Sequence, residues 1–516
     1  MTTRVLRIFI ATAGLFLFLS VLHLSFGYEY KFIYVLSAAA LFTFCLSFSR
    51  VLYILLLTIY LLSGLIYGAV GINYGYPDVN AVGSLMYTDN GESLEYIAGL
   101  PFKTYLYLAG LLIFAGCALL MKPLKKRHQR IVLFTVFFIT AFWSSSKDYI
   151  QGKSEGFVSV FKSGLPEIRF FRDSYESYVQ IRKDNLRYAK VIETSDHWNP
   201  QVTETGYDTY ILVIGESVRK DFMHAFGFEL HPNTPWMSSR NGLFFDNYIS
   251  ASGSTTLSLT NALAVREGKV TNLSDNLVAL ANKAGFHTYW ISNQHMKGIY
   301  DSPVGIMGKK AGFYHFLAPN RSDKGGPDEM LLPFVRDALA EKNGKKLIVV
   351  HLIGSHPQPC GRLTENFDKF IGSRNISCYI KSIENTDKLL SGIAAMAGQE
   401  HQRWTMAYFS DHGLLFTDKG TENTNLTHGD SMKQNFQVPF FITAFDAQSQ
   451  NRITHFRSGL SMLPLLSQWM GIKEAKLDNH CDWLRDTECA GQRNVVDFKN
   501  ELKSFDSLPE DNPVLP

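Results

Sequence analysis

Long apolar runs dominate the first 147 residues of the chain. Five such runs, separated by short polar segments, cover residues 5–27, 31–48, 51–72, 104–121 and 131–146. About 20 mostly apolar residues are enough for a helix to cross the hydrocarbon core of a bilayer. We therefore predict a transmembrane domain with five helices over residues 1–147. The first run is long for a signal peptide and no small-residue cleavage site follows it, so we expect it to be retained.

The charges between these runs predict the orientation of the helices. If the N-terminus lies inside, the charged residues of the inner segments are all basic, namely Arg4, Arg50, Lys122, Lys125, Lys126, Arg127 and Arg130. The charged residues of the outer segments are mostly acidic. Cytoplasmic loops of membrane proteins are enriched in Lys and Arg. Everything after residue 147 is therefore predicted to lie outside the cytoplasm.

Residues 148–205 read as an amphipathic connector. Apolar side chains recur there among Lys and Arg at a roughly helical spacing, at Phe157, Val160, Phe161, Ile168, Phe170, Phe171 and Tyr178. This pattern is typical of a helix that lies on a membrane surface. A helix packed on the domain that follows would show the same pattern, and both can hold together.

From residue 206 the pattern changes to short, continuous apolar runs alternating with helical patterns. The runs at 210–214, 288–292, 347–353 and 405–410 are typical of buried parallel strands. Helical patterns such as 275–285 and 379–397 lie between them. We predict that residues 206–516 form an α/β domain with a mostly parallel sheet. Ligands of such sheets bind at the carboxyl ends of the strands.

Composition narrows the function classes. The chain has 516 residues, of which 46% are hydrophobic and 19% charged, and this excludes a disordered protein. A net charge of +3 gives no case for nucleic-acid binding. Four of the six cysteines lie in the predicted exterior domain, where an even number suggests disulfides. Three pairings are open, and sequence proximity favours Cys360–Cys378 and Cys481–Cys489.

Reactive side chains follow the ends of the predicted strands. Glu216 follows the first strand, and Asp411 and His412 follow the last. Thr255 lies in a loop of small residues that leads into a helical pattern. Carboxylates and imidazole suit Zn²⁺, and a metal beside a hydroxyl makes that hydroxyl a nucleophile at neutral pH. Each piece alone also has an ordinary structural explanation, such as a helix start, a cap or a local hydrogen bond.

The order of these pieces resembles the phosphoethanolamine transferases, inner-membrane enzymes of Gram-negative bacteria within the alkaline phosphatase and sulfatase superfamily. The matching segments are residues 214–219, the Thr255 loop, 354–356, 409–413, 427–429 and 437–440. The likeness covers almost the whole chain, since that family also has five N-terminal helices and a periplasmic domain. It implies an alkaline phosphatase/sulfatase-like fold for residues 206–516.

The resemblance also implies roles for single residues. Glu216, Thr255, Asp411 and His412 match the family's zinc ligands, with Thr255 as the nucleophile and Thr256 as the competing hydroxyl. His356 and His428 match residues that bind the transferred phosphate or hold a second zinc. His351 is a weaker match to a histidine near the substrate. A buried histidine at a strand end would explain His351 equally well.

The outer loop 73–103 matches the family at Thr88 and Glu92, which are expected to help seat the lipid donor. Glu92 could equally be a solvated loop acid, and Ser84 stands where the family has Asn. Lys297 lies near a family Lys, but the alignment there is off by one, and a surface position is expected.

The implied reaction has two steps. Phosphoethanolamine passes from phosphatidylethanolamine to Thr255 and then to a periplasmic glycan, either an osmoregulated periplasmic glucan or the lipid A and core of lipopolysaccharide. Lipid A-modifying members carry a Cys pair where this chain has Ala251 and Asn261. The segments closer to the glucan branch are 252–255, 292–294, 301–303 and 355–358. A multi-pass inner-membrane monomer is expected, with its catalytic domain in the periplasm.

Three other readings remain open. A sulfatase or phosphodiesterase would use the same metal ligands with water as acceptor, but the Arg of the usual sulfatase motif is missing from 254–258. A glycerol-phosphate transferase would share the five helices and the Thr but use phosphatidylglycerol and usually manganese. A membrane-anchored binding protein with a degenerate site is the third reading, and the presence of all four expected ligands argues against it.

Overall fold

The computed structural model describes residues 2–88, 93–94, 96–97, 99–151, 163–296, 302–319, 325–342, 344–365, 371–400, 402–477, 480–489, 491 and 493–515. The chain divides into two compact units. We call Met1–Leu85 with Leu100–Arg182 the helical unit, and Met86–Gly99 with Lys183–Pro516 the α/β unit.

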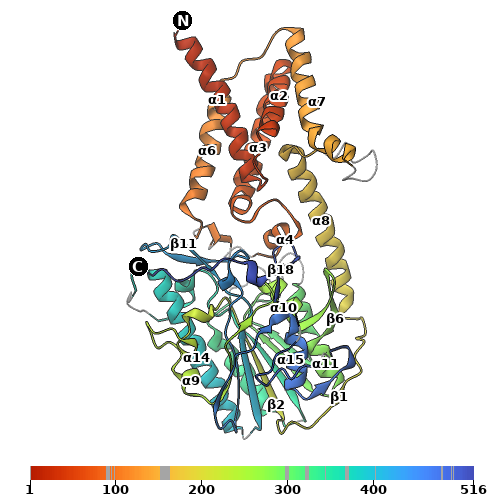
Figure 1. Ribbon diagram of the computed structural model, residues 1–516, viewed down its shortest axis with the longest axis vertical. Helices are drawn as coiled ribbons and strands as arrows, with labels where there is room; N and C mark the ends of the chain where they lie inside the picture. Colours follow the sequence, from red (N-terminus) through yellow and green to blue (C-terminus); the bar gives the residue numbers. More distant parts are fainter. Residues whose placement is uncertain are drawn as a thin grey trace. The chain divides into compact units, whose positions relative to one another are not determined.

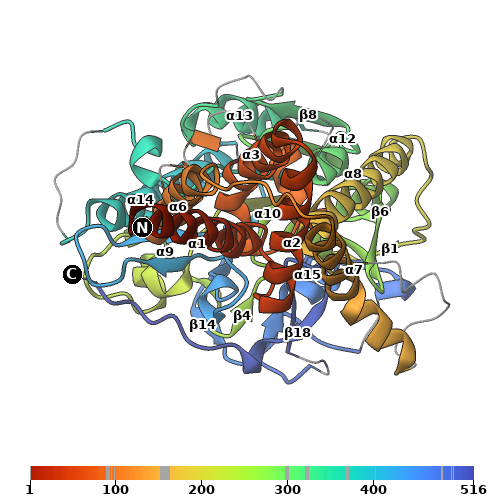
Figure 2. The ribbon, with the colours of Figure 1, turned by 90° about the horizontal axis from the view of Figure 1, so that it is seen from above.

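Each of the five apolar runs forms a helix, as the sequence predicts (Figures 1 and 2). These helices are α1 (Thr2–Ser25), α2 (Phe32–Phe48), α3 (Arg50–Tyr74), α6 (Phe102–Ala118) and α7 (Arg127–Ile150). Among the described residues, only Val5–Ser25 and Arg50–Tyr74 are long and apolar enough to cross a membrane. Helices α2 and α6 are apolar but shorter. The helical unit therefore has two clear apolar spans, and five transmembrane helices remain a prediction.

Small residues let the helices of this unit approach closely. Gly64, Gly68 and Gly71 lie on one face of α3, where a side chain would collide with Leu22, with Leu108 and with the carbonyl of Ser25. Such small-residue faces are typical of helix packing in membranes. At the end of α1, His23 Nε2 lies 2.8 Å from Glu167 Oε1, and both side chains are fully buried. This contact holds the first turn of α8 (Pro166–Val191) against α1.

Helix α8 occupies much of the segment that the sequence predicts to be an amphipathic connector. Its first part packs on the helical unit, where the Phe170 ring stacks on Phe26 at 4.0 Å. Phe171 and Tyr178 of the same helix stay partly exposed. Phe157, Val160 and Phe161 lie outside the described residues. The sequence analysis did not predict this packing of Phe170 on the helical unit. Val191, the last residue of α8, lies in a core of the α/β unit, as the alternative of packing on the following domain requires.

The α/β unit is built on an eight-stranded sheet with the order β14-β3-β13-β10-β2-β9-β7-β8. Five neighbouring strands are parallel, and the buried runs of the sequence form four of them. The parallel strands are β10 (Trp404–Ser410), β2 (Thr209–Gly215), β9 (Lys346–His351), β7 (His287–Ser292) and β8 (Phe313–Phe316). The antiparallel part holds β13 (Phe440–Ala444), and the edge holds β3 (Gly242–Phe245) and β14 (Gln450–Ile453).

Helices cover both faces of this sheet (Figure 1). Alternate residues of β2 enter two separate cores, because successive side chains of a strand point to opposite faces. One core contains residues of α10 (Thr255–Leu263), α11 (Leu277–Lys283), α12 (Pro303–Lys309) and α15 (Met462–Trp469). The other contains residues of α9 (Pro235–Ser239), α13 (Leu332–Ala340) and α14 (Arg374–Gln399). This is the predicted α/β architecture, and burial on both faces explains the continuous apolar runs.

Disulfides and a buried ion pair fix the loops around the sheet. Cys360 is bonded to Cys378 and Cys481 to Cys489, which confirms the pairing that sequence proximity favours. The guanidinium of Arg219 is fully buried and donates to Asp221 and to Asp511 Oδ2, the latter at 2.8 Å. Asp511 also accepts from the backbone N–H of Phe416. The C-terminal tail is thereby anchored to the segment that follows β2.

We expect Asp511→Ala to lower the free energy of unfolding of the α/β unit by about 3–5 kcal/mol, because it removes one partner of a buried ion pair. The matched control is Asp506→Ala, whose partner Arg493 lies 3.4 Å away on the surface, and it should cost less than about 1 kcal/mol. Denaturant unfolding in detergent, followed by tryptophan fluorescence, measures both. Equal losses in the two variants would contradict the anchoring role.

Candidate metal centre and active site

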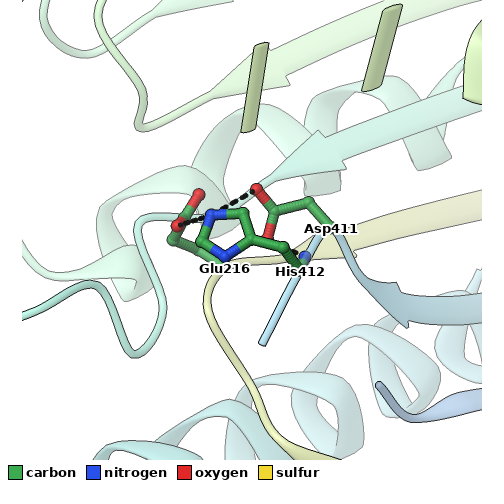
Figure 3. A group of neighbouring side chains, drawn as sticks. All are labelled: Glu216, Asp411 and His412. Carbon is green, nitrogen blue, oxygen red and sulfur yellow. Dashed lines mark hydrogen bonds and ion pairs between the residues drawn. The ribbon is translucent and has the colours of Figure 1, made fainter. Parts of the chain in front are cut away.

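The sheet brings three predicted ligands together. Strands β2 and β10 are parallel neighbours, with Gly215 paired to Ser410, so Glu216 and the Asp411–His412 pair leave the sheet side by side. His412 Nε2 lies 3.2 Å from Glu216 Oε1 and 3.5 Å from Asp411 Oδ2 (Figure 3). All three side chains are fully buried. Their ligand atoms lie within 4.8 Å of one another.

Two buried carboxylates this close strongly perturb each other's titration. Burial, followed by the charge of Glu216, raises the pKa of Asp411 to about 8. Burial opposes the charged form of His412, but Asp411 and Glu216 together raise the pKa of this imidazole to about 9. Burial also opposes the charged form of Glu216, yet the His412 imidazolium outweighs it and holds the pKa of Glu216 well below its usual range. In the metal-free cluster, protons on His412 and Asp411 therefore balance the negative charge.

The donor set suits a divalent cation. Asp411 Oδ2 is buried and accepts no hydrogen bond from any described residue. His412 Nδ1 lies 2.9 Å from the carbonyl of Gly413, an arrangement that leaves Nε2 facing the carboxylates. Two carboxylates and one imidazole are oxygen and nitrogen ligands that Zn²⁺ and related ions accept. A bound cation would supply the positive charge that the protons supply without it.

Thr255 places a hydroxyl beside this cluster. It is the first residue of α10, and its Oγ1 donates to Glu216 Oε2 at 3.0 Å and lies 3.3 Å from His412 Nε2. The residue Thr255 as a whole is only partly buried, unlike the three cluster residues. The N-terminus of a helix also favours a negatively charged group next to it. Among the described residues Thr256 makes no such contact, and its carbonyl accepts from Thr260 Oγ1 within the helix.

Two further predicted histidines line the same centre. The ring of His428 lies 5.0 Å from that of His412 and 5.5 Å from that of His356, measured between centroids. Burial lowers the pKa of His356 to about 4, and burial with the neighbouring imidazoles holds the pKa of His428 well below its usual range. Both rings are therefore neutral at pH 7. A neutral imidazole can bind a metal ion or hold a phosphoryl oxygen through its N–H.

The structure describes two of the remaining predicted site residues, His351 and Thr88. His351 is 1% exposed at the end of β9, where its Nδ1 lies 3.3 Å from Ser292 Oγ, as a buried strand-end histidine would. Thr88 belongs to the α/β unit and is partly buried. Glu92 and Lys297 lie outside the described residues.

Comparison with known proteins agrees with this geometry. The Sulfatase family matches residues 208–472, which hold every member of the cluster. The phosphoethanolamine transferase OpgE of Escherichia coli K12 is 35% identical over 85% of this chain and 84% of its own. This chain belongs to the phosphoethanolamine transferase family. A putative phosphoethanolamine transferase of Haemophilus influenzae is 32% identical to this transferase over 70% of the chain and 74% of its own.

Solved structures show the same fold as this transferase. The periplasmic domain of EptC from Escherichia coli, crystallised as a complex with Zn, superposes with a TM-score of 0.53 at 20% identity and covers 62% of this chain and 98% of its own. At this identity the likeness speaks for the fold alone. Together with the match to the Sulfatase family, this likeness confirms the alkaline phosphatase/sulfatase-like fold of the α/β unit.

Several residues of the transferase site escaped the sequence analysis. Gln294 Nε2 donates to Glu216 Oε2 at 3.0 Å and to the carbonyl of Leu352 at 2.9 Å, so it orients the carboxylate. Ser217 has a φ of 61°, and its hydroxyl donates to Glu216 Oε1. This left-handed turn lets the Ser217 N–H reach Asp411 Oδ1 at 3.1 Å. A non-glycine residue in that conformation leaves no mark in the sequence.

We expect cation binding by this transferase to release protons. Because the metal-free cluster holds protons on His412 and Asp411 at pH 7, Zn²⁺ must displace at least one of them to reach the lone pairs. The apparent affinity for Zn²⁺ should therefore rise as the pH increases from about 6 to about 9. Titration calorimetry in two buffers of different ionisation enthalpy measures the released protons.

The matched control is His455→Gln, which alters a surface histidine beside Asp486 and should leave the proton release unchanged. Binding without proton release, or an affinity that does not depend on pH, would contradict the protonation of the cluster.

Proposed function

We propose that this protein is a zinc-dependent transferase that moves phosphoethanolamine from phosphatidylethanolamine to a periplasmic glycan through Thr255. One observation carries the proposal: the Thr255 hydroxyl donates to Glu216 at the edge of the buried Glu216/Asp411/His412 cluster. The residue that carries this hydroxyl is partly buried, and the hydroxyl lies at a helix N-terminus and adjoins the ligands of a cation. Membership of the transferase family supplies the group that is moved.

The proposed cofactor is Zn²⁺, held by Glu216, Asp411, His412 and the Thr255 oxygen. The mixed oxygen and nitrogen donors suit this ion, and the EptC domain of the same fold was crystallised with Zn. When bound, zinc supplies Lewis-acid chemistry that lowers the pKa of a neighbouring hydroxyl and offsets negative charge on phosphoryl oxygens. His356 and His428 are proposed to hold the phosphoryl group, or a second zinc.

The first half-reaction forms one bond and breaks another. Thr255 Oγ1 attacks the phosphorus of the lipid, the bond between phosphorus and the diacylglycerol oxygen breaks, and diacylglycerol leaves with the proton that Thr255 gives up. Glu216 Oε2, at 3.0 Å, orients the attacking hydroxyl. The neutral rings of His356 and His428 are N–H donors for the phosphoryl oxygens. Phosphoethanolamine then stays on Thr255 until an acceptor hydroxyl displaces it.

A lipid donor would explain why the chain carries an apolar helical unit, because the donor lies in the membrane. Two helices are long and apolar enough to span a membrane, and we propose that α2, α6 and α7 complete a five-helix transmembrane domain over residues 1–147. The two disulfides of the α/β unit support an oxidising compartment, the periplasm, for residues 206–516. Thr88 and Glu92 remain proposed contacts of the donor.

For the acceptor we propose an osmoregulated periplasmic glucan before lipid A or the core of lipopolysaccharide. Residues 252–255, 292–294 and 355–358 resemble the branch of the family that modifies periplasmic glucans. Ala251 and Asn261 also replace the Cys pair of the lipid A branch. The chain is proposed to act as a monomer.

Thr255→Ala tests the nucleophile. We expect the purified protein, in detergent with Zn²⁺ and fluorescent phosphatidylethanolamine, to release diacylglycerol, and the variant to lose this activity by roughly 10³-fold or more. Thr255→Ser, which keeps a hydroxyl, should retain part of it. Thr256→Ala is the matched control and should stay active. Activity lost in Thr256→Ala but kept in Thr255→Ala would move the nucleophile, and release of the headgroup from phosphatidylglycerol alone would overturn the donor.

A further inference from the structure

A hollow lined by both polar and apolar residues lies beside the catalytic centre but does not contain it. It has a volume of about 300 Å³, at the lower end of the range for ligand pockets. Its walls are the segment after β7, the loop 325–329, the turn after β9 and one face of α14. We call this hollow the β7–α14 pocket. None of the proposed ligands, and not Thr255, is among its lining residues.

Two walls of the β7–α14 pocket touch residues of the catalytic centre. Gly354 packs so closely on Glu216 that an added Cβ would lie 3.1 Å from the Glu216 backbone nitrogen. Arg362 Nη2 lies 3.4 Å from His356 Nδ1. Both Gly354 and Arg362 line the pocket. A molecule held in the pocket is therefore one residue away from the metal cluster on one side and from the phosphate-holding histidines on the other.

The lining offers hydrogen bonds to a neutral, hydroxyl-rich molecule. Asn293 is 2% exposed, and its Oδ1 is buried without a hydrogen-bond donor among the described residues. Its amide group donates to Gly326 and Asp328, which leaves this oxygen to accept a hydrogen bond from a molecule in the pocket that Asn293 lines. Glu329 adds an exposed carboxylate, and Asn385 adds a partly exposed amide from α14. The lining therefore offers both acceptors and donors.

The pocket is held open by the fold rather than by a ligand. The Asp328 carboxylate accepts from the backbone N–H groups of Ile353 and Gly354 and from Asn293, which fixes two walls against each other. The Cys360–Cys378 disulfide ties the wall that carries Arg362 to α14. A pocket that is ordered beforehand costs less ordering when it binds. This argues for a binding site and not for a fortuitous gap.

We propose that the β7–α14 pocket binds a pyranose ring of the acceptor and presents one of its hydroxyls to the phosphoethanolamine on Thr255. The inference rests on the proposed function. The hydroxyl oxygen attacks phosphorus, the bond between phosphorus and Thr255 Oγ1 breaks, and the hydroxyl proton passes to Thr255. An ethanolamine group is much smaller than the hollow. The lining mixes apolar side chains such as Ile353 and Leu389 with polar ones such as Asn293 and Asn385, which suits the two faces and the hydroxyls of a sugar ring better than acyl chains.

The test separates acceptor binding from the donor step. Asn385→Ala and Glu329→Gln alter the pocket without touching the cluster, and Glu267→Gln, an exposed carboxylate outside the lining, is the matched control. Release of diacylglycerol without acceptor measures the donor step. Transfer to a linear glucose oligosaccharide, or to lipopolysaccharide core in a second arm, gives KM for the acceptor.

We expect each pocket variant to raise the acceptor KM roughly tenfold, as loss of a hydrogen bond to the ligand would, with a donor step within about twofold of wild type. The arm that shows saturable transfer identifies the source of the ring. A KM unchanged in both arms, or a donor step that falls as far as the transfer, would overturn the inference while leaving the proposed function in place. If wild type releases no diacylglycerol, the proposed function fails and the inference falls with it.

Discussion

The α/β unit buries two carboxylates and one imidazole next to one another, and the rest of its site depends on this constraint. Glu216 and Asp411 are fully buried and share His412, and such a cluster needs compensating positive charge because water is excluded. Protons on His412 and Asp411 supply it in the metal-free protein. A divalent cation would supply it in the working enzyme. The buried negative charge of the cluster therefore favours binding of a cation beside Thr255.

The surroundings of the cluster follow from that constraint. The parallel pairing of β2 with β10 sets the spacing of the ligands, and β9, on the other side of β2, delivers the turn at Gly354. Gly354 has a φ of +47° and lies against Glu216, so a larger residue there would push the turn away from the carboxylate. The same turn forms a wall of the β7–α14 pocket. The proposed metal site, the proposed nucleophile and the proposed acceptor pocket thus lie at the same carboxyl-terminal edge of the sheet.

The sequence predicted the elements well and the local turns poorly. Continuous apolar runs identified β2, β7, β9 and β10 because parallel strands are buried on both faces. Glu216, Asp411 and His412 could be predicted because they follow those strands directly. Gln294 and Ser217 could not, since their roles depend on a side-chain rotamer and a left-handed turn that no spacing encodes. His351, the last residue of β9, is buried beside Ser292 and is not a member of the Glu216/Asp411/His412 cluster. In the helical unit, length and hydropathy together identify α1 and α3 as clear spans, whereas α2 and α6 are shorter and α7 is less apolar.

The central claim is that Thr255 accepts phosphoethanolamine from a lipid beside the cation cluster. The most direct test is the intact mass of the purified protein after incubation with phosphatidylethanolamine and Zn²⁺ in the absence of acceptor, followed by peptide mapping. The account predicts a mass gain of one phosphoethanolamine group, located on Thr255 and absent when zinc is chelated. A protein that binds zinc and releases diacylglycerol without any covalent adduct, or an adduct on another residue, would contradict it.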